Sequence, residues 1–387
     1  MPGFEVFGEE ERQAINELFD INGGILFAHG FDAMRKGVYR VREFEAAFAA
    51  KMGVPYAQAV SSCTAALLTG LKALGVGPGD EVILPCFTFV ATCEAVIHAG
   101  ATPVIVDVDA SLNMDPAALE AAITPRTKVA VPVHMMGAPA DLDPIMAVAA
   151  KHGIKVLEDT AQGCGGTYKG RPLGTIGDVG AFSFDAGKVI ITGEGGMVIC
   201  RDEATFRTAR AYHDHGHEYS QTIGRGQEGA LCDGFNFRMT ELQGAIGLVQ
   251  LGKLDMILAR QRENKKRLLA EIAELPYQRR VINDQGELGD AIIFFLDSAE
   301  QAGRFVAGMA REGLGTKNLP DAMRWHFAAN WEHMFKKYGW YADSYQTQWS
   351  RSADLLTRAV ALPVMVKMTD ARIAEIGEKL RRIAKEI

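Results

Sequence analysis

Hydrophobic positions in the first two-thirds of the chain form short strand-like runs that alternate with longer helix-like runs. The strand-like runs cover residues 57–62, 81–85, 102–108, 128–134 and 155–159. Helix-like runs cover residues 64–76, 88–100 and 141–153. This alternation predicts an α/β fold with a mainly parallel sheet covered by helices on both faces. In such sheets, ligands bind at the carboxyl ends of the strands.

The pattern changes after about residue 245. A long charged helix is expected from Leu251 to about Leu275, followed by a shorter α/β segment. That segment contains an apolar run at 291–296 and a helix-like run at 300–313, and a strand-like run at 359–364 precedes a polar terminal helix. We therefore expect two domains: a large one over residues 1–250, which includes an N-terminal segment, and a smaller C-terminal one over 251–387.

Composition is ordinary for a soluble globular protein, with 48% hydrophobic and 23% charged residues. The net charge of −7 argues against a nucleic-acid partner, which favours a basic surface. The first residues lack a signal-peptide pattern, and no apolar stretch approaches the roughly 20 residues that span a membrane. The six cysteines form no CxxC pair. We expect a cytoplasmic protein with no membrane association and no bound metal.

One lysine stands in a loop of small residues. The apolar run at 181–184 leads through Asp185, Ala186 and Gly187 to Lys188, and glycines follow at 193–196. Glycine allows a ligand to approach the backbone closely. Taken alone, the segment is more typical of a surface hairpin with a solvated lysine than of a binding site.

Three further features precede this lysine. Asp159 ends a strand-like run, where a carboxylate can pair with a protonated pyridine nitrogen or cap the next helix. Small hydroxyl residues at 61–64 precede a helix, which is typical of an anion site and also of an ordinary N-cap. Phe89 can stack on a cofactor ring or belong to the core.

Taken in this order, the features resemble the DegT/DnrJ/EryC1/StrS family of sugar aminotransferases, which are pyridoxal-phosphate (PLP) enzymes of fold type I. The resemblance covers nearly the whole chain. The matching motifs lie at residues 61–67, 79–92, 124–137, 157–198 and 234–255. It implies the aspartate aminotransferase-like fold, in which a mainly parallel large domain carries a smaller α/β domain.

The resemblance assigns roles to individual residues. It implies that Lys188 is the catalytic residue, which binds PLP as a Schiff base and moves a proton between cofactor and substrate. Asp159 would keep the pyridine nitrogen protonated, and Phe89 would stack on the ring. Related sugar dehydratases carry His at the position of Lys188, so the lysine implies transamination.

The remaining implied contacts concern the phosphate and the phenolic oxygen of PLP. Thr64, Ala65 and Ser183 would bind the phosphate, and Gln162 would lie near the phenolic oxygen. Asn236 would reach the phosphate of the neighbouring subunit, so the resemblance implies a homodimer with shared active sites. The sequence departs from the family at Cys63, where glycine is usual. We expect the phosphate turn to survive there, with an oxidation-sensitive thiol that is not catalytic.

The resemblance also implies the substrates: a keto-sugar would receive an amino group from glutamate or glutamine. Residues 1–8, 31–45, 209–219 and 325–334 resemble the subfamily that makes 8-amino-3,8-dideoxy-manno-octulosonate (8-amino-Kdo) for lipopolysaccharide. One alternative is an aminotransferase for 3- or 4-keto-deoxysugars attached to a nucleoside diphosphate. Another is a non-catalytic PLP-binding regulator, although such proteins typically carry a DNA-binding segment and this sequence shows none.

Some charged residues have open roles. A sugar acid needs a cationic partner, but each candidate is more typical of a surface or structural residue; the candidates are Arg225, Arg238, Lys317 and Arg324. Four residues resemble a metal cluster, although we favour a substrate-facing loop for them; these are His213, Asp214, His215 and His217. Trp325 and His326 either line the sugar pocket or belong to the core.

Overall fold

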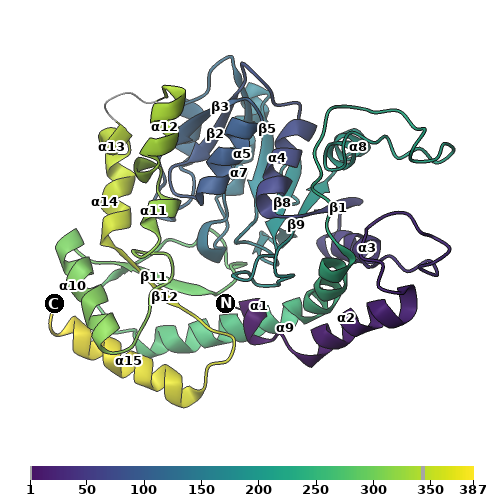
Figure 1. Cartoon of the computed structure of the whole chain (residues 1–387). Coiled ribbons are helices and arrows are strands. Elements are labelled where there is room, and N and C mark those ends of the chain that lie inside the picture. The colour runs from purple at the N-terminus through teal and green to yellow at the C-terminus, as the bar shows by residue number, and fades with distance from the viewer. Residues whose placement is uncertain (1, 341–344) are drawn as a thin grey trace.

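The computed structural model describes residues 2–340 and 345–387 and is built around a seven-stranded sheet (Figure 1). The strand order is β1-β9-β8-β5-β4-β2-β3, and within this sheet only β9 runs antiparallel to its neighbours. The strands are β1 (Tyr56–Val60), β2 (Glu81–Pro85), β3 (Thr102–Val106), β4 (Thr127–Ala130), β5 (Lys155–Asp159), β8 (Val179–Ser183) and β9 (Gly196–Cys200). The expected mainly parallel α/β sheet is confirmed.

Helices cover both faces of this sheet because neighbouring residues of a strand point to opposite sides. On β8, Phe182 packs at 5.0 Å (ring centroids) from Phe48 of α3 (Arg40–Met52). Val179 points the other way, toward α4 (Cys63–Ala73). A Cβ added to Gly70 of α4 would meet Leu157 of β5 at 2.7 Å, so glycine lets this helix approach the sheet closely. The remaining helices of this part are α5 (Val90–His98), α6 (Pro116–Ala121), α7 (Leu142–His152) and α8 (Glu203–Tyr212).

A second, three-stranded antiparallel sheet has its own apolar core. It consists of β10 (Gln278–Arg279), β11 (Ala291–Phe295) and β12 (Ala359–Pro363). Helices α10 (Ala299–Arg311) and α15 (Asp370–Ala384) pack on it around Phe294 and Phe305. The smaller elements are α1 (Pro2–Glu5), β6 (Thr167–Tyr168), β7 (Arg171–Pro172), η1 (Met135–Gly137), α11 (Met323–His326), η2 (Ala328–Asn330), α12 (Glu332–Tyr338), α13 (Tyr345–Gln348) and α14 (Ser350–Arg358).

The long helix α9 (Glu241–Glu271) runs along the base of both parts (Figure 1). It begins at Glu241 rather than at the expected Leu251, because Thr240 and Gln243 form a capping box that starts the helix earlier. The domain boundary expected at residue 250 falls inside this continuous helix. The division into two domains therefore stays a prediction.

Helix α9 also corrects the expectation about apolar stretches. By length and composition alone, it could cross a membrane. It packs, however, against α2 (Glu9–Asn22), α3 and α15, and Lys253 on it forms ion pairs with Glu10 and Glu11. These contacts are those of a core helix.

The aromatic contact between α3 and β8 makes a prediction about stability. Phe48 is fully buried, and its ring contacts Phe44, Phe182 and Phe184. Replacing it with Ala removes this packing and leaves a cavity. We expect Phe48→Ala to lower the free energy of unfolding by about 3–5 kcal/mol in urea titrations.

The control is Val281→Ala, because Val281 is 46% exposed. That variant should unfold near the wild-type midpoint. Equal stability of Phe48→Ala and wild type would show that the aromatic cluster does not hold α3 on the sheet.

Candidate active site

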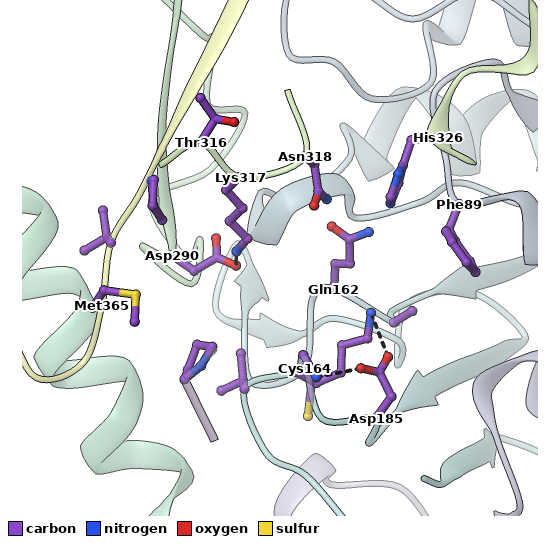
Figure 2. Close-up of a pocket in the computed structure, with 17 residues that line it drawn as sticks. Phe89, Gln162, Cys164, Asp185, Asp290, Thr316, Lys317, Asn318, His326 and Met365 are labelled. Carbon is purple, nitrogen blue, oxygen red and sulfur yellow. Dashed lines mark hydrogen bonds and ion pairs between the residues drawn. The ribbon is translucent and has the colours of Figure 1, made fainter. Parts of the chain in front are cut away.

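Two adjoining cavities open at the carboxyl ends of the parallel strands. The smaller has a volume of about 240 Å³ and the larger about 470 Å³. Five residues line both cavities: Phe89, Ala161, Gln162, Asp185 and Lys188. The smaller cavity is lined by strand ends, helix starts and loops of the part built on the large sheet, and the larger extends to residues of the second sheet (Figure 2). This is the edge at which the strand pattern predicts a ligand.

Lys188 lies in the loop between β8 and β9, with its side chain 21% exposed. Its Nζ lies 3.3 Å from Oδ2 of Asp185. Asp185 also accepts hydrogen bonds from the Ser183 hydroxyl and from the Gly187 N–H. The loop therefore presents a single amine to both cavities from an ordered turn, rather than to bulk solvent.

Asp159 ends β5 at the wall of the smaller cavity, where it is 3% exposed. Its Oδ2 accepts a hydrogen bond from Thr92 Oγ1 (2.8 Å), and its Oδ1 accepts one from the Ala161 N–H (3.1 Å). Burial raises the pKa of Asp159, although these bonds and the nearby Lys188 oppose the shift. A buried carboxylate in this state would be stabilised by a cationic group bound in the cavity.

Hydroxyl groups also line the smaller cavity. Ser62 and Thr64, at the start of α4, and Ser183, at the end of β8, are among the residues that line it. Ala65 is not, and its N–H donates to Ser62 Oγ (3.1 Å) as part of the helix cap. Hydroxyl groups are therefore available at the predicted anion site. The Ala65 N–H is not free to bind an anion while it donates to Ser62.

Phe89 and Gln162 line both cavities, and Figure 2 shows them on the wall of the larger one. The ring of Phe89 is 45% exposed and lies 5.2 Å from that of His326. Gln162 is oriented by its Oε1, which accepts the Met136 N–H. His326 donates from Nδ1 to the Ala322 carbonyl, and burial lowers its pKa, so its Nε2 carries a lone pair. Of the two roles considered for His326, pocket lining and core packing, the structure shows that it lines the larger cavity.

Asn236 lines neither cavity of its own chain. It is exposed, and its backbone bridges to that of Asp214. The buried Asp214 carboxylate pairs with Arg225 and Arg238 and accepts a hydrogen bond from Tyr219 (2.6 Å). Two of the candidate carboxylate partners therefore have a structural role, since they hold the segment that carries Asn236.

The histidine-rich segment also lines neither cavity. His213 is buried, which lowers its pKa to about 4, and His217 pairs with Glu228. Among the described residues, no group of His, Cys, Asp and Glu side chains could hold a metal ion.

Of the other candidates, Lys317 lines the larger cavity, whereas Arg324 and Trp325 do not. Cys63 lines the smaller one, and burial raises the pKa of its thiol.

Comparison with known proteins decides the family. Residues 31–381 match the DegT/DnrJ/EryC1/StrS aminotransferase family. The chain belongs to this family. It is 36% identical over 390 residues to the spore coat polysaccharide biosynthesis protein SpsC of Bacillus subtilis, covering 98% of this chain and 96% of SpsC.

Two further relatives are similar over most of their length. The UDP-N-acetyl-3-dehydro-alpha-D-glucosamine 3-aminotransferase of Acidithiobacillus ferrooxidans is 34% identical over 345 residues, 88% of each chain. The structure of Spr1654 from Streptococcus pneumoniae in its PLP form superposes with a TM-score of 0.84 at 25% identity, covering 98% of this chain and 97% of that one. The protein is thus a PLP-dependent aminotransferase of the sugar aminotransferase family, with the fold of PLP aminotransferases.

The smaller cavity of this aminotransferase fits PLP chemically. The cofactor has an aldehyde, a basic pyridine nitrogen, an aromatic ring and a phosphate. The cavity offers an amine at Lys188, a buried carboxylate at Asp159, an aromatic face at Phe89, and hydroxyls at Thr64 and Ser183. The raised pKa of Asp159 is the feature that most requires a cationic ring, because that carboxylate has no cation hydrogen-bonded to it among the described residues.

Sequence reasoning missed two groups that position the predicted residues. Thr92 donates to Asp159, and Asp185 orders the turn that carries Lys188. The signal for Thr92 was its place one turn after Phe89 on a helix, where i and i+3 residues share a face. No sequence signal distinguished Asp185 from an ordinary turn aspartate.

Glu158 supports the site from the opposite side of β5. Its carboxylate is fully buried and accepts hydrogen bonds from the N–H groups of Gly174, Ile176 and Gly177 (2.6–2.7 Å). His134 adds a fourth contact: its Nδ1 accepts the Ala140 N–H, so its Nε2–H donates to Glu158. Burial alone would raise the pKa of Glu158, but these bonds outweigh burial and lower it.

This network predicts how stability depends on pH. Because the folded-state pKa of Glu158 lies below its ordinary value of 4.5, its contribution is full above that pH and is lost as the pH falls through the lowered value. We expect Glu158→Gln to lower the free energy of unfolding by about 3–5 kcal/mol at neutral pH. Urea unfolding at several values between about pH 3 and pH 7 measures both the loss and its dependence on pH.

The control is Glu378→Gln, which changes an exposed carboxylate on α15. It should leave stability within about 0.5 kcal/mol of wild type. If Glu158→Gln matched this control, the buried network would contribute nothing to the stability of the sheet.

Proposed function

We propose that this aminotransferase transfers an amino group from glutamate or glutamine to the 8-oxo group of 3-deoxy-manno-octulosonate, giving 8-amino-3,8-dideoxy-manno-octulosonate. The observation that carries this proposal is the larger cavity beside Lys188. At about 470 Å³ it suits a single sugar acid, and it contains a second cation, Lys317. A cytoplasmic reaction that supplies lipopolysaccharide synthesis is the corresponding setting.

PLP bound in the smaller cavity would act as an electron sink for negative charge that develops at the substrate carbon. We assign covalent attachment of the cofactor and proton transfer at Nζ to Lys188. Asp159 would pair with the pyridine nitrogen, and Thr92 would orient that carboxylate. Phe89 would stack on the ring, and Gln162 would face the phenolic oxygen.

The phosphate would lie at the start of α4, where the hydroxyls of Thr64 and Ser183 and the backbone of Ala65 would bind it. We propose that Asn236 completes this site in a second copy of the chain. Support comes from the exposed apolar side chains near it, since Ile223, Leu231 and Phe235 are each 45% exposed or more. Phe27 and Phe31, on the loop after α2, are also exposed, and both loops project from the same side (Figure 1). A homodimer would cover these surfaces.

A nucleotide-linked keto-sugar is the second candidate substrate, because the relative from Acidithiobacillus ferrooxidans is named for a UDP-sugar. GDP-perosamine synthase of Caulobacter vibrioides is also 45% identical over 218 residues, 56% of this chain and 57% of that protein. The two candidates differ in size and charge. A regulator without catalytic activity has no support from these relatives.

Lys188 provides the first test. We expect Lys188→Ala to bind PLP without a covalent bond and to lose transaminase activity by at least about 100-fold, because general acid–base transfer at Nζ disappears. Borohydride reduction followed by peptide mass analysis measures the covalent bond.

Lys155→Ala is the matched control, because Lys155 is an exposed lysine that pairs with Asp178 at the far end of β5. It should keep both properties. Covalent PLP on another lysine in Lys188→Ala would refute the assignment.

The acceptor provides the second test. Enzyme converted to its aminated form by glutamate is mixed with equal amounts of the 8-oxo sugar acid or of UDP- and GDP-linked 3- or 4-keto-sugars. We expect return of the PLP absorption with the sugar acid at least about 100-fold faster, a difference of about 2.7 kcal/mol. Faster return with a nucleotide sugar would replace the proposed substrate with the alternative.

A further inference from the structure

The larger cavity contains one cationic side chain whose role no family motif explains. Of the described residues that line the two cavities, only Lys188 and Lys317 carry an ammonium group. Lys188 stands where PLP is to be bound. Lys317 comes from a different part of the chain, between α10 and α11, and faces the cavity beside Asp290 (Figure 2).

The backbone around Lys317 is firmly held on the second sheet. The Lys317 N–H donates to the Ala361 carbonyl of β12 (2.9 Å), and the Ala361 N–H donates to the Leu319 carbonyl (3.2 Å). Asn318, between them, adopts a φ of 63°, a left-handed conformation that asparagine tolerates better than most residues. The ammonium group therefore projects from a fixed loop.

Asp290 orients this ammonium group. The Lys317 Nζ donates to Asp290 Oδ2, and Asp290 directly precedes β11, the strand that pairs with β12. The Asp290 side chain is 8% exposed, whereas that of Lys317 is 24% exposed. Asp290 Oδ1 is buried and has no hydrogen-bond partner in the described part of the chain. Both side chains line the cavity, and the Lys317 ammonium is the more exposed end of the pair.

A lysine ammonium has three N–H donors, and the bond to Asp290 uses one of them. The others can bind an anion that enters the cavity. Asn318 and the unprotonated Nε2 of His326 line the same space and add neutral hydrogen-bonding groups. Together these groups suit a carboxylate attached to a short polar chain or to a sugar.

We propose that Lys317 is the carboxylate anchor for both substrates. It would bind the side-chain carboxylate of glutamate in one half-reaction and the carboxylate of the sugar acid in the other. In each substrate this carboxylate is remote from the carbon that reacts at PLP, and Lys317 lies on the wall contributed by the second sheet. The acceptor part of this inference rests on the proposed function, whereas the glutamate part does not.

The test removes the ion pair without leaving a buried charge. The double variant Lys317→Met with Asp290→Asn is compared with Lys317→Arg and with wild type. Conversion of PLP to the aminated cofactor is followed by absorption in single turnovers, with glutamate and separately with glutamine. Glutamine has the same length but carries an amide in place of the side-chain carboxylate.

In the double variant we expect the half-saturating glutamate concentration to rise about 10- to 100-fold, as for loss of a hydrogen bond to a charged group. The value for glutamine should change less than about threefold, since its amide makes no comparable charge pair. The limiting rate should stay near wild type, because Lys317 binds the substrate and does not transfer the proton. Lys317→Arg should restore most of the affinity for glutamate.

The matched control is Lys265→Met with Glu287→Gln, an ion pair of similar burial that lines neither cavity. It should behave as wild type. Equal weakening of glutamate and glutamine, or no weakening of either, would overturn the proposal. Loss of PLP absorption in the Lys317/Asp290 variant alone would also overturn it, because the pair would then serve the fold.

The same variants are then tested with the 8-oxo sugar acid and its methyl ester. The acid should lose about 10- to 100-fold in affinity and the ester little. One outcome is that wild type aminates neither compound while the double variant still shows weaker binding of glutamate. In that case the proposed acceptor is wrong, and Lys317 remains the anchor for the donor. If the acid and the ester weaken equally, the anchor for the acceptor is refuted.

Discussion

The fully buried carboxylate of Glu158 is the constraint on which the catalytic edge of the sheet depends. It ties β5 to the turn that leads into β8 and to the loop that follows β4 through His134. A buried charge is tolerated only when its hydrogen bonds are complete, so this network admits one arrangement of three neighbouring segments. Asp159 is the next residue, and alternation along the strand turns it away from Glu158. One network therefore fixes the position of the carboxylate that faces the cofactor cavity.

The Lys188 amine and the Asp159 carboxylate are positioned by different structural elements. Asp159 lies at the end of a buried strand, whereas Lys188 stands on a turn ordered by Asp185. Parallel neighbours β5 and β8 bring both to the same edge. The carboxylate is therefore positioned by a strand, and the amine by a turn that Asp185 orders.

The second sheet and its loops supply one wall of the larger cavity. Its strands β11 and β12 hold Asp290 and the loop of Lys317 respectively, and helix α9 runs beneath both sheets. Under the proposed assignments, substrate selectivity and cofactor chemistry would come from separate layers of one molecule.

The sequence alone determined the parallel sheet and the family, and it predicted residues that line the smaller cavity, among them Asp159 and Lys188, because these depend on local order: strand, turn and helix start recur along the chain. It misplaced the start of α9, although the capping pattern at 240–243 was readable, and it left Lys317 among four equal candidates. Only the tertiary structure separated them. Arg225 and Arg238 form ion pairs with Asp214, which lies 11 and 24 residues away in the sequence. Lys317 instead faces the cavity from a loop that is hydrogen-bonded to β12. Charge is visible in a sequence, but the partner of a charge is decided by contacts between distant segments, and those exist only once the chain has folded.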